Sequence, residues 1–233
     1  MMTESAQLAL AVHLRDEATL ENFLFPEALL PLRISIESQH KPEGEAGIYL
    51  HGGPGSGRSH LLQAACNAQV GGEALYLPLE QLCELAAAEV LADIEGLALI
   101  CLDNLDAIVG RADWEEALFH LLNRARMSHC RLLFGAASAP RQLGIKLADL
   151  ESRLSWAVVF HMPEPAEADK LRILQFRASR RGMTLSDEAA QYIFNRASRS
   201  LSELIALLEQ LDRASMVAQR HLSIPFVRQT LGW

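Results

Sequence analysis

A glycine-rich segment at residues 52–59 constrains the fold of this chain more than any other part of its sequence. It reads G-G-P-G-S-G-R-S and fits the pattern G-x-x-x-x-G-[K/R]-S, with Arg58 where lysine is usual. An apolar run, 47–51, precedes it, and a helical pattern that includes Leu61 and Leu62 follows it. A strand, a glycine loop and a helix in this order are typical of a phosphate-binding loop, because the loop's N–H groups and the helix dipole both attract an anion. The predicted phosphate-binding residues are Gly52, Gly53, Pro54, Gly55, Ser56, Gly57, Arg58, Ser59 and His60.

Composition limits the partners that this chain would use. Its 233 residues carry a formal net charge of −8, which argues against nucleic acid as the main partner, since DNA binding requires a basic surface. The 4 cysteines lie far apart, without a C-x-x-C pair, and are expected to be reduced, buried thiols. No apolar run approaches the length of a membrane span, and the N-terminus lacks the basic start of a signal peptide. We therefore expect a cytoplasmic protein with no membrane partner.

Alternating apolar and amphipathic runs predict an α/β domain over residues 16–163. Helical patterns such as 117–125 separate the expected strands, which are 48–51, 74–77, 97–102, 132–136 and 157–161. This alternation predicts a central parallel sheet with helices on both faces and a nucleotide at the carboxyl ends of the strands. Residues 1–15 are expected to form an extended tail.

A small all-α domain is predicted over residues 164–233. Pro163-Glu164-Pro165 marks the boundary, and only helical patterns follow it. The helices are expected at 166–181, from a cap at Ser186 to about 197, from a capping box at 200–203, and from Pro225 onwards.

An acidic residue at the end of the third expected strand completes the predicted nucleotide site. Four apolar residues precede Asp103, the usual form of a strand that organises Mg²⁺. Asp103 would hold the ion through water and Ser59 would bind it directly, although whether Mg²⁺ is bound is left open. Asn104 stands where many ATPases have glutamate, and an amide cannot take a proton from water. With Arg58, this predicts stable binding of ADP or another nucleoside diphosphate and slow or no ATP hydrolysis. The alternative is an ATPase that turns over its own ATP.

The glycine loop, the Asp103 strand and the two-domain layout resemble the AAA+ ATPases and, within them, the DnaA branch, over nearly the whole chain. The fold that this resemblance implies is an AAA+ P-loop domain followed by a helical lid domain. Residues 18–23 are similar to a segment that lies near the adenine in DnaA-like proteins. This implies a nucleotide contact for Phe23, and an ordinary core position is the alternative.

Residues 150–156, L-E-S-R-L-S-W, are similar to the segment that carries an arginine finger in the DnaA branch. The resemblance implies that Arg153 acts in trans, as a catalytic group that stabilises charge on the nucleotide of a neighbouring subunit. The alternative is a surface arginine paired with Asp149 or Glu151.

Two positions depart from the DnaA pattern. Ala137 stands where a polar sensor is expected, and only Ser138 beside it is polar. Ser202 stands at the lid sensor position, where the family has arginine, and Arg199 is the alternative contact one turn earlier. Both departures indicate a degraded catalytic site that still binds a nucleotide.

The tail, residues 1–15, carries a short motif of a kind other than nucleotide-binding. Gln7, Leu8 and Leu10 resemble the start of peptides that dock on the bacterial sliding clamp. Together with the core, this resembles the Hda type of DnaA-related proteins, the regulatory inactivators of DnaA. The resemblance implies a negative regulator of chromosome replication that holds ADP, docks on the DNA polymerase III sliding clamp (beta subunit) and stimulates hydrolysis of DnaA-bound ATP. The alternatives are a self-sufficient AAA+ ATPase of the helicase-loader type and a DNA-binding initiator that is a DnaA paralogue. Because no DNA-reading domain follows the lid, sequence-specific DNA binding is not expected; nucleotide-dependent homodimerisation is left open.

Overall fold

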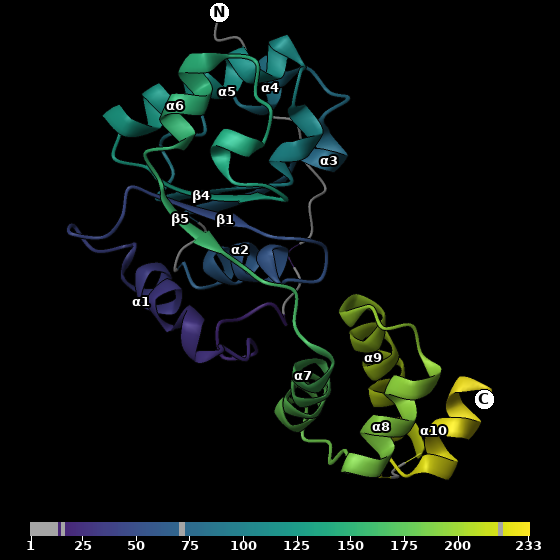
Figure 1. Cartoon of the computed structure of the whole chain (residues 1–233). Helices are drawn as coiled ribbons and strands as arrows, with labels where there is room; N and C mark the ends of the chain where they lie inside the picture. The colour runs from purple at the N-terminus through teal and green to yellow at the C-terminus, as the bar shows by residue number, and fades with distance from the viewer. Residues whose placement is uncertain (1–13, 15–16, 70–72, 219–220) are drawn as a thin grey trace, which may run out of the picture. The chain divides into compact units, whose positions relative to one another are not determined.

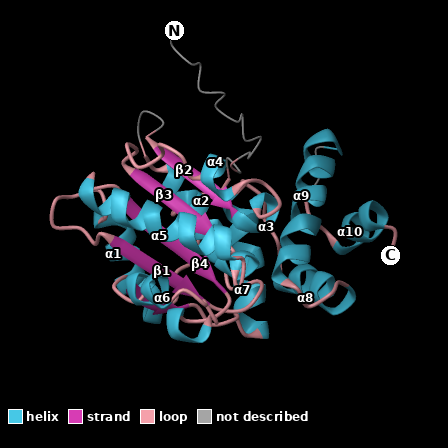
Figure 2. Ribbon diagram, turned by 90° about the horizontal axis from the view of Figure 1, so that it is seen from above, coloured by secondary structure: helices cyan, strands magenta, loops and turns pink. Residues whose placement is uncertain are grey.

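Short apolar runs separated by helices form one five-stranded parallel sheet, as the sequence predicts (Figure 2). This computed structural model describes residue 14 and residues 17–69, 73–218 and 221–233. The strands, in the order β2-β3-β4-β1-β5, are β1 Gly47–His51, β2 Ala74–Pro78, β3 Leu99–Asp103, β4 Arg131–Ala136 and β5 Val158–His161. Because the carboxyl ends of parallel strands meet at one edge, the segments that follow β1, β3 and β4 converge there.

Helices cover both faces of the sheet (Figure 1). One face carries α1 Leu30–Ser38 and α2 Arg58–Asn67; the other carries α3 Leu79–Leu82, α4 Ala87–Val90, α5 Ala112–Met127 and α6 Ala148–Leu154. Three short 3-10 turns, Glu27–Leu29, Leu105–Ile108 and Pro140–Gln142, complete this unit. All residues of β3 are buried, because a parallel strand covered on both faces contacts apolar neighbours with every side chain.

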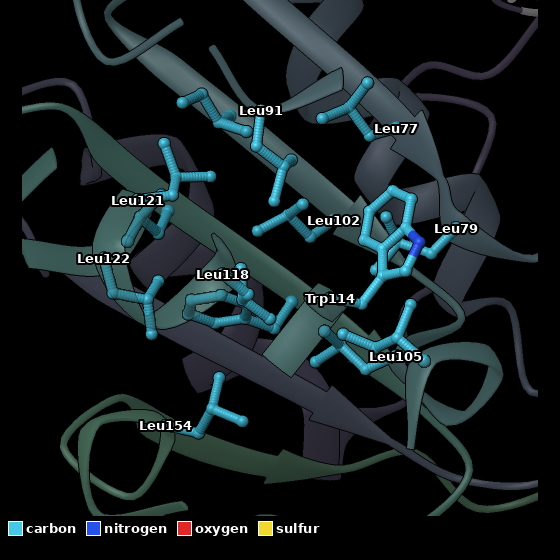
Figure 3. Close-up of a cluster of buried hydrophobic side chains, with 14 of the residues drawn as sticks. Leu77, Leu79, Leu91, Leu102, Leu105, Trp114, Leu118, Leu121, Leu122 and Leu154 are labelled. Carbon is cyan, nitrogen blue, oxygen red and sulfur yellow. The ribbon is translucent and has the colours of Figure 1, made fainter. Parts of the chain in front are cut away.

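Trp114 of α5 lies at the centre of the larger core (Figure 3). It is fully buried, and its ring lies near Leu79 and Leu105 in Figure 3. Its indole N–H donates to the carbonyl of Cys83 at 3.0 Å, so the polar atom of the ring is satisfied. This contact joins α5 to the segment that follows α3.

The chain divides into two units, and the second, Glu164–Trp233, is entirely helical. Its helices are α7 Glu167–Arg180, α8 Asp187–Arg196, α9 Leu201–Ala218 and α10 Ile224–Leu231, each beginning within one residue of the predicted start. Ser186 caps α8 by accepting from the N–H of Ala189 at 3.3 Å, as predicted. Ser223, which the sequence analysis did not identify, caps α10 by accepting from the N–H of Phe226 at 3.4 Å.

Candidate nucleotide-binding site

The glycine loop between β1 and α2 adopts a backbone that only glycine fits at two positions. Gly57 begins α2 in the left-handed region, at φ 92°, and a Cβ there would lie 2.6 Å from the ring of Phe23. A Cβ at Gly52 would lie 2.0 Å from the carbonyl oxygen of Met162. These close approaches fix the loop between β5 and the segment that carries Phe23.

Two polar atoms of the loop region are buried and lack partners. Ser56 Oγ and Arg58 Nη1 have no hydrogen bond to any residue that the structure describes. A buried donor without a partner is costly, so such atoms are expected to meet a ligand. A guanidinium N–H and a hydroxyl are both suited to phosphate oxygens, and the residues of this loop therefore fit an anionic group.

Two histidines lie at the ends of the strands beside the loop. The rings of His51 and His161 lie 5.0 Å apart at the carboxyl ends of β1 and β5. Burial lowers the pKa of His51, and the positive charges of His161 and Arg58 lower it further. Burial is the main cause, so the lowered pKa shows that the fold disfavours a charged imidazole at this position.

The segment predicted to approach the nucleotide does lie against the loop. The Phe23 ring is 5.7 Å from the His60 ring and 4.6 Å from the Phe25 ring, and it packs at the margin of the α1–α2 core. His60, the last predicted phosphate-binding residue, has Nε2 at 2.9 Å from the carbonyl oxygen of Thr19. Phe23 is thus next to the loop and also part of the core. The predicted nucleotide contact and the alternative, an ordinary core position, are therefore compatible.

Asp103 has no exposed atom at the end of β3. Its Oδ2 accepts a hydrogen bond from the hydroxyl of Tyr76 at 2.8 Å, and its Oδ1 accepts from the N–H of Asn104 at 3.0 Å. The whole residue is buried. Each oxygen thus accepts one hydrogen bond from the protein, and a carboxylate has further acceptor sites, so the role of Asp103 in holding Mg²⁺ through water with Ser59 stays a prediction. Among the described residues, no three His, Cys, Asp or Glu side chains form a cluster suited to a metal ion.

The residues around Asn104 were not anticipated. Asn104 itself has a positive φ of 57°, and its amide Nδ2 donates to Glu80 Oε2 at 3.1 Å. The carboxylate of Asp106 accepts from the N–H of Ala137 at 2.8 and 3.1 Å. The carboxylate of Asp106, in the Leu105–Ile108 turn, thus lies beside Ala137, the position where a polar sensor was expected. No local pattern indicated Asp106, and only the fold brings Glu80 and Asn104 together.

Arg153 lies near the end of α6, half-buried, and stacks on Trp156. The guanidinium carbon is 4.3 Å from the centre of the Trp156 ring, and that of Arg126 is 5.0 Å from the same ring. Trp156 is 60% exposed. No ion pair between described residues involves Arg153, so the predicted alternative, a pairing with Asp149 or Glu151, is not formed.

A buried carboxylate holds the start of the helix that carries Arg153. Glu115 of α5 is 2% exposed, and its Oε1 accepts from the N–H of Gly110 at 2.7 Å. Its Oε2 accepts from the N–H groups of Lys146 and Leu147 at 2.9 and 2.8 Å. Leu147 is the residue immediately before α6, so a negative charge meets the positive end of this helix dipole.

The predicted lid contacts are engaged within their own unit. Arg199 is exposed and forms an ion pair with Glu167. The hydroxyls of Ser202 and Ser200 lie 2.7 Å apart, at the start of α9. Gln7, Leu8 and Leu10 lie outside the described residues. Over the part of the chain that the structure describes, no helix is long and apolar enough to cross a membrane.

The chain is similar to known proteins along nearly its whole length. Residues 167–231 match the family described as "Hda, lid domain". A protein of Haemophilus influenzae, named only "Uncharacterized protein", is 39% identical over 229 residues, which cover 97% of this chain and 98% of that protein.

Solved structures share the fold at low identity. Domain III of the Thermotoga maritima replication initiation protein DnaA has a TM-score of 0.76 at 19% identity, covering 95% of this chain and 98% of that one. DnaA from Aquifex aeolicus bound to AMPPCP has a TM-score of 0.69 at 19% identity, covering 89% and 71%. The Thermotoga maritima RuvB branch migration motor has a TM-score of 0.66 at 17% identity, covering 92% and 71%. The P-loop sheet, the helical lid and these likenesses together show an AAA+ fold like that of DnaA, and residues 167–231 belong to the Hda lid domain family.

Proposed function

We propose that this chain is a negative regulator of bacterial chromosome replication that presents Arg153 to ATP bound on DnaA and thereby stimulates its hydrolysis. The observation that carries the proposal is the state of Arg153, which is stacked on an exposed tryptophan at 4.3 Å and held by no ion pair between described residues. A guanidinium held in this way has its planar fork of donors available to a second molecule.

The rate effect expected of such a group is large. An arginine that stabilises charge on a transferring phosphoryl group is worth about 10³–10⁵ in rate in well-studied hydrolases. Trp156 supports the finger, because a stacked guanidinium loses less conformational freedom when it meets a partner. The Hda lid match and the DnaA-like fold support a replication-related role for the whole chain.

The loop is proposed to bind ADP stably and to hydrolyse ATP slowly or not at all. The unpartnered Ser56 Oγ and Arg58 Nη1 support phosphate binding, as does the AMPPCP bound to the similar DnaA structure. Asn104 lacks the basicity to activate water, which supports slow turnover. Phe23 is proposed to contact the base. Arg199 is proposed to reach the phosphates after leaving Glu167, since an exposed ion pair is worth only about 0–1 kcal/mol.

The decisive experiment is Arg153→Ala in an assay of DnaA-bound ATP hydrolysis. The variant should abolish stimulation while binding of ADP and of the clamp stays unchanged. Arg33→Ala is the matched control, because Arg33 is also stacked on an aromatic ring, Phe25, at 5.6 Å. Retained stimulation by Arg153→Ala, or equal loss in both variants, would remove Arg153 from the mechanism.

Docking on the sliding clamp is proposed for Gln7, Leu8 and Leu10. Gln7→Ala should weaken capture by the immobilised beta subunit and leave ADP binding unaltered. Thr3→Ala, in the same tail, serves as the control. If the immobilised beta subunit captures Gln7→Ala as well as the wild type, the tail is not the clamp-binding segment.

One contact favours a second function, an ATPase that acts on its own nucleotide. Glu80 Oε2 lies 3.1 Å from the amide of Asn104, so a carboxylate from α3 stands beside the position where ATPases have their base. Multiple turnover of ATP by the isolated protein, lost in Glu80→Gln, would favour this function over the first.

A further inference from the structure

Tyr76 reaches Asp103 from the neighbouring strand. Pairing of β2 with β3 sets Tyr76 opposite Cys101 and Pro78 opposite Asp103. Since side chains alternate along a strand, Asp103 points to the same face of the sheet as Cys101, the face covered by α2. Tyr76 lies on that face too, because it pairs with Cys101, two residues before Asp103.

The bond between the two side chains is enclosed. The phenolic hydroxyl donates to Asp103 Oδ2 at 2.8 Å, and Tyr76 is only 8% exposed. A Cβ on Gly135 of β4 would lie 2.4 Å from Asp103 Oδ1, so the backbone of β4 closes the other side of the carboxylate. Burial raises the pKa of Tyr76 well above its usual value, and the charge and hydrogen bond of Asp103 raise it further. In the pair, the phenolic O–H is the donor and the carboxylate the acceptor.

The same hydroxyl is influenced by α2. The side chains of Gln63 and Ser59 act on it as hydrogen-bonding partners and lower its pKa. Ser59 is the residue expected to bind Mg²⁺ directly, and Asp103 is the residue expected to bind it through water. The Tyr76 hydroxyl thus lies between the two groups on which a magnesium site would depend.

We propose that the Tyr76 hydroxyl makes the hydrogen bond to Asp103 that a Mg²⁺-bound water would otherwise make, so that this loop holds a nucleoside diphosphate without requiring a divalent cation. The proposal rests on the proposed function, in which the loop binds ADP. A metal-bound water and a phenol both donate one O–H to the carboxylate, so one replaces the other without leaving an acceptor empty. Arg58, whose buried Nη1 has no partner among the described residues, supplies positive charge to the phosphates.

The test is calorimetric titration of the nucleotide-free full chain with ADP, once with Mg²⁺ and once with EDTA. The wild-type Kd is expected to differ by less than about threefold between the two buffers. Tyr76→Phe frees one carboxylate oxygen while keeping the ring, so Mg²⁺ should now tighten ADP binding by about tenfold or more. Tyr49→Phe is the matched control, because its buried hydroxyl donates to the carbonyl of Ser138 at 3.0 Å on the other face, and it should behave as wild type.

Two further readouts keep the proposal open to refutation if Tyr76→Phe does not fold. The wild-type comparison needs no variant, and a Kd that weakens tenfold or more in EDTA overturns the proposal. Ser59→Ala should change the Kd equally in both buffers, and a loss confined to the Mg²⁺ buffer overturns it as well. Binding that requires Mg²⁺ contradicts this inference alone, whereas ADP that binds in neither buffer removes the proposed nucleotide site itself.

Discussion

The first two glycines of the loop are adjacent in sequence but differ sharply in what a methyl group would meet. In Gly52→Ala the new Cβ would lie 2.0 Å from the carbonyl oxygen of Met162, where ordinary contact begins at 3.4 Å. The backbones of β1 and β5 must therefore separate by more than an ångström. This movement strains the hydrogen bonds from Met162 N–H to His51 at 2.7 Å and from Gly52 N–H to Ala136 at 3.2 Å. Overpacking costs about 1–3 kcal/mol and each weakened hydrogen bond about 0.5–1.5 kcal/mol, so we expect a destabilisation of roughly 2–6 kcal/mol.

Thermal unfolding of the nucleotide-free protein, followed by circular dichroism, measures this effect. At roughly 2–4 °C per kcal/mol for a chain of this size, Gly52→Ala should lower Tm by at least about 4 °C. Gly53→Ala is the control, since a Cβ there meets no atom within 4 Å, and its Tm should stay within about 1 °C of wild type. A Gly52→Ala variant that melts like wild type, or a Gly53→Ala variant that loses as much, would refute the packing argument.

Three further predictions follow from single side chains. Trp156→Ala should reduce stimulation of DnaA-bound ATP hydrolysis by about two- to fivefold, because a cation–π contact at an exposed site is worth about 0.5–1 kcal/mol, whereas Trp233→Ala should not; equal activity of both variants would contradict this. Since the pKa of His51 is lowered in the fold, the unfolded chain binds more protons below its own pKa of about 6.5, so stability should fall as pH drops through that value. Urea midpoints measured at several pH values check this, and His51→Gln should flatten the dependence; an unaltered slope would refute it. In the native protein iodoacetamide should label Cys83 first, as mass spectrometry can detect, because the other cysteines are buried and burial raises the pKa of Cys130 to about 11; early labelling of Cys130 would count against this.

The α/β architecture was predictable because its signals are local. Each strand is a short apolar run, and α8 and α10 of the lid each begin with a serine whose side chain caps the first turn. The capping box at Ser200 is less clear in the structure, since the Ser200 hydroxyl pairs with Ser202 at 2.7 Å. The segment after Pro26 begins as a 3-10 turn, and α1 starts at Leu30.

The site was only partly predictable because several of its contacts join strands that are distant in sequence. The glycine loop is contiguous, so its pattern gives every residue. Tyr76 reads as one more aromatic in a buried strand until β2 and β3 pair and bring its hydroxyl to Asp103. Glu80 likewise becomes relevant only when α3 follows β2 to the same edge as Asn104. Such contacts depend on strand order, which no local pattern specifies.

The hydrogen bonds of Glu115 bear on how precisely α6 and its Arg153 are oriented. One carboxylate ties three backbone amides from two loops, and the second of these loops leads directly into α6. The direction of the helix that carries Arg153, the proposed finger, is therefore set by buried contacts within this chain. Under the proposed function, DnaA would spend no binding energy on ordering this helix, which would favour a productive encounter.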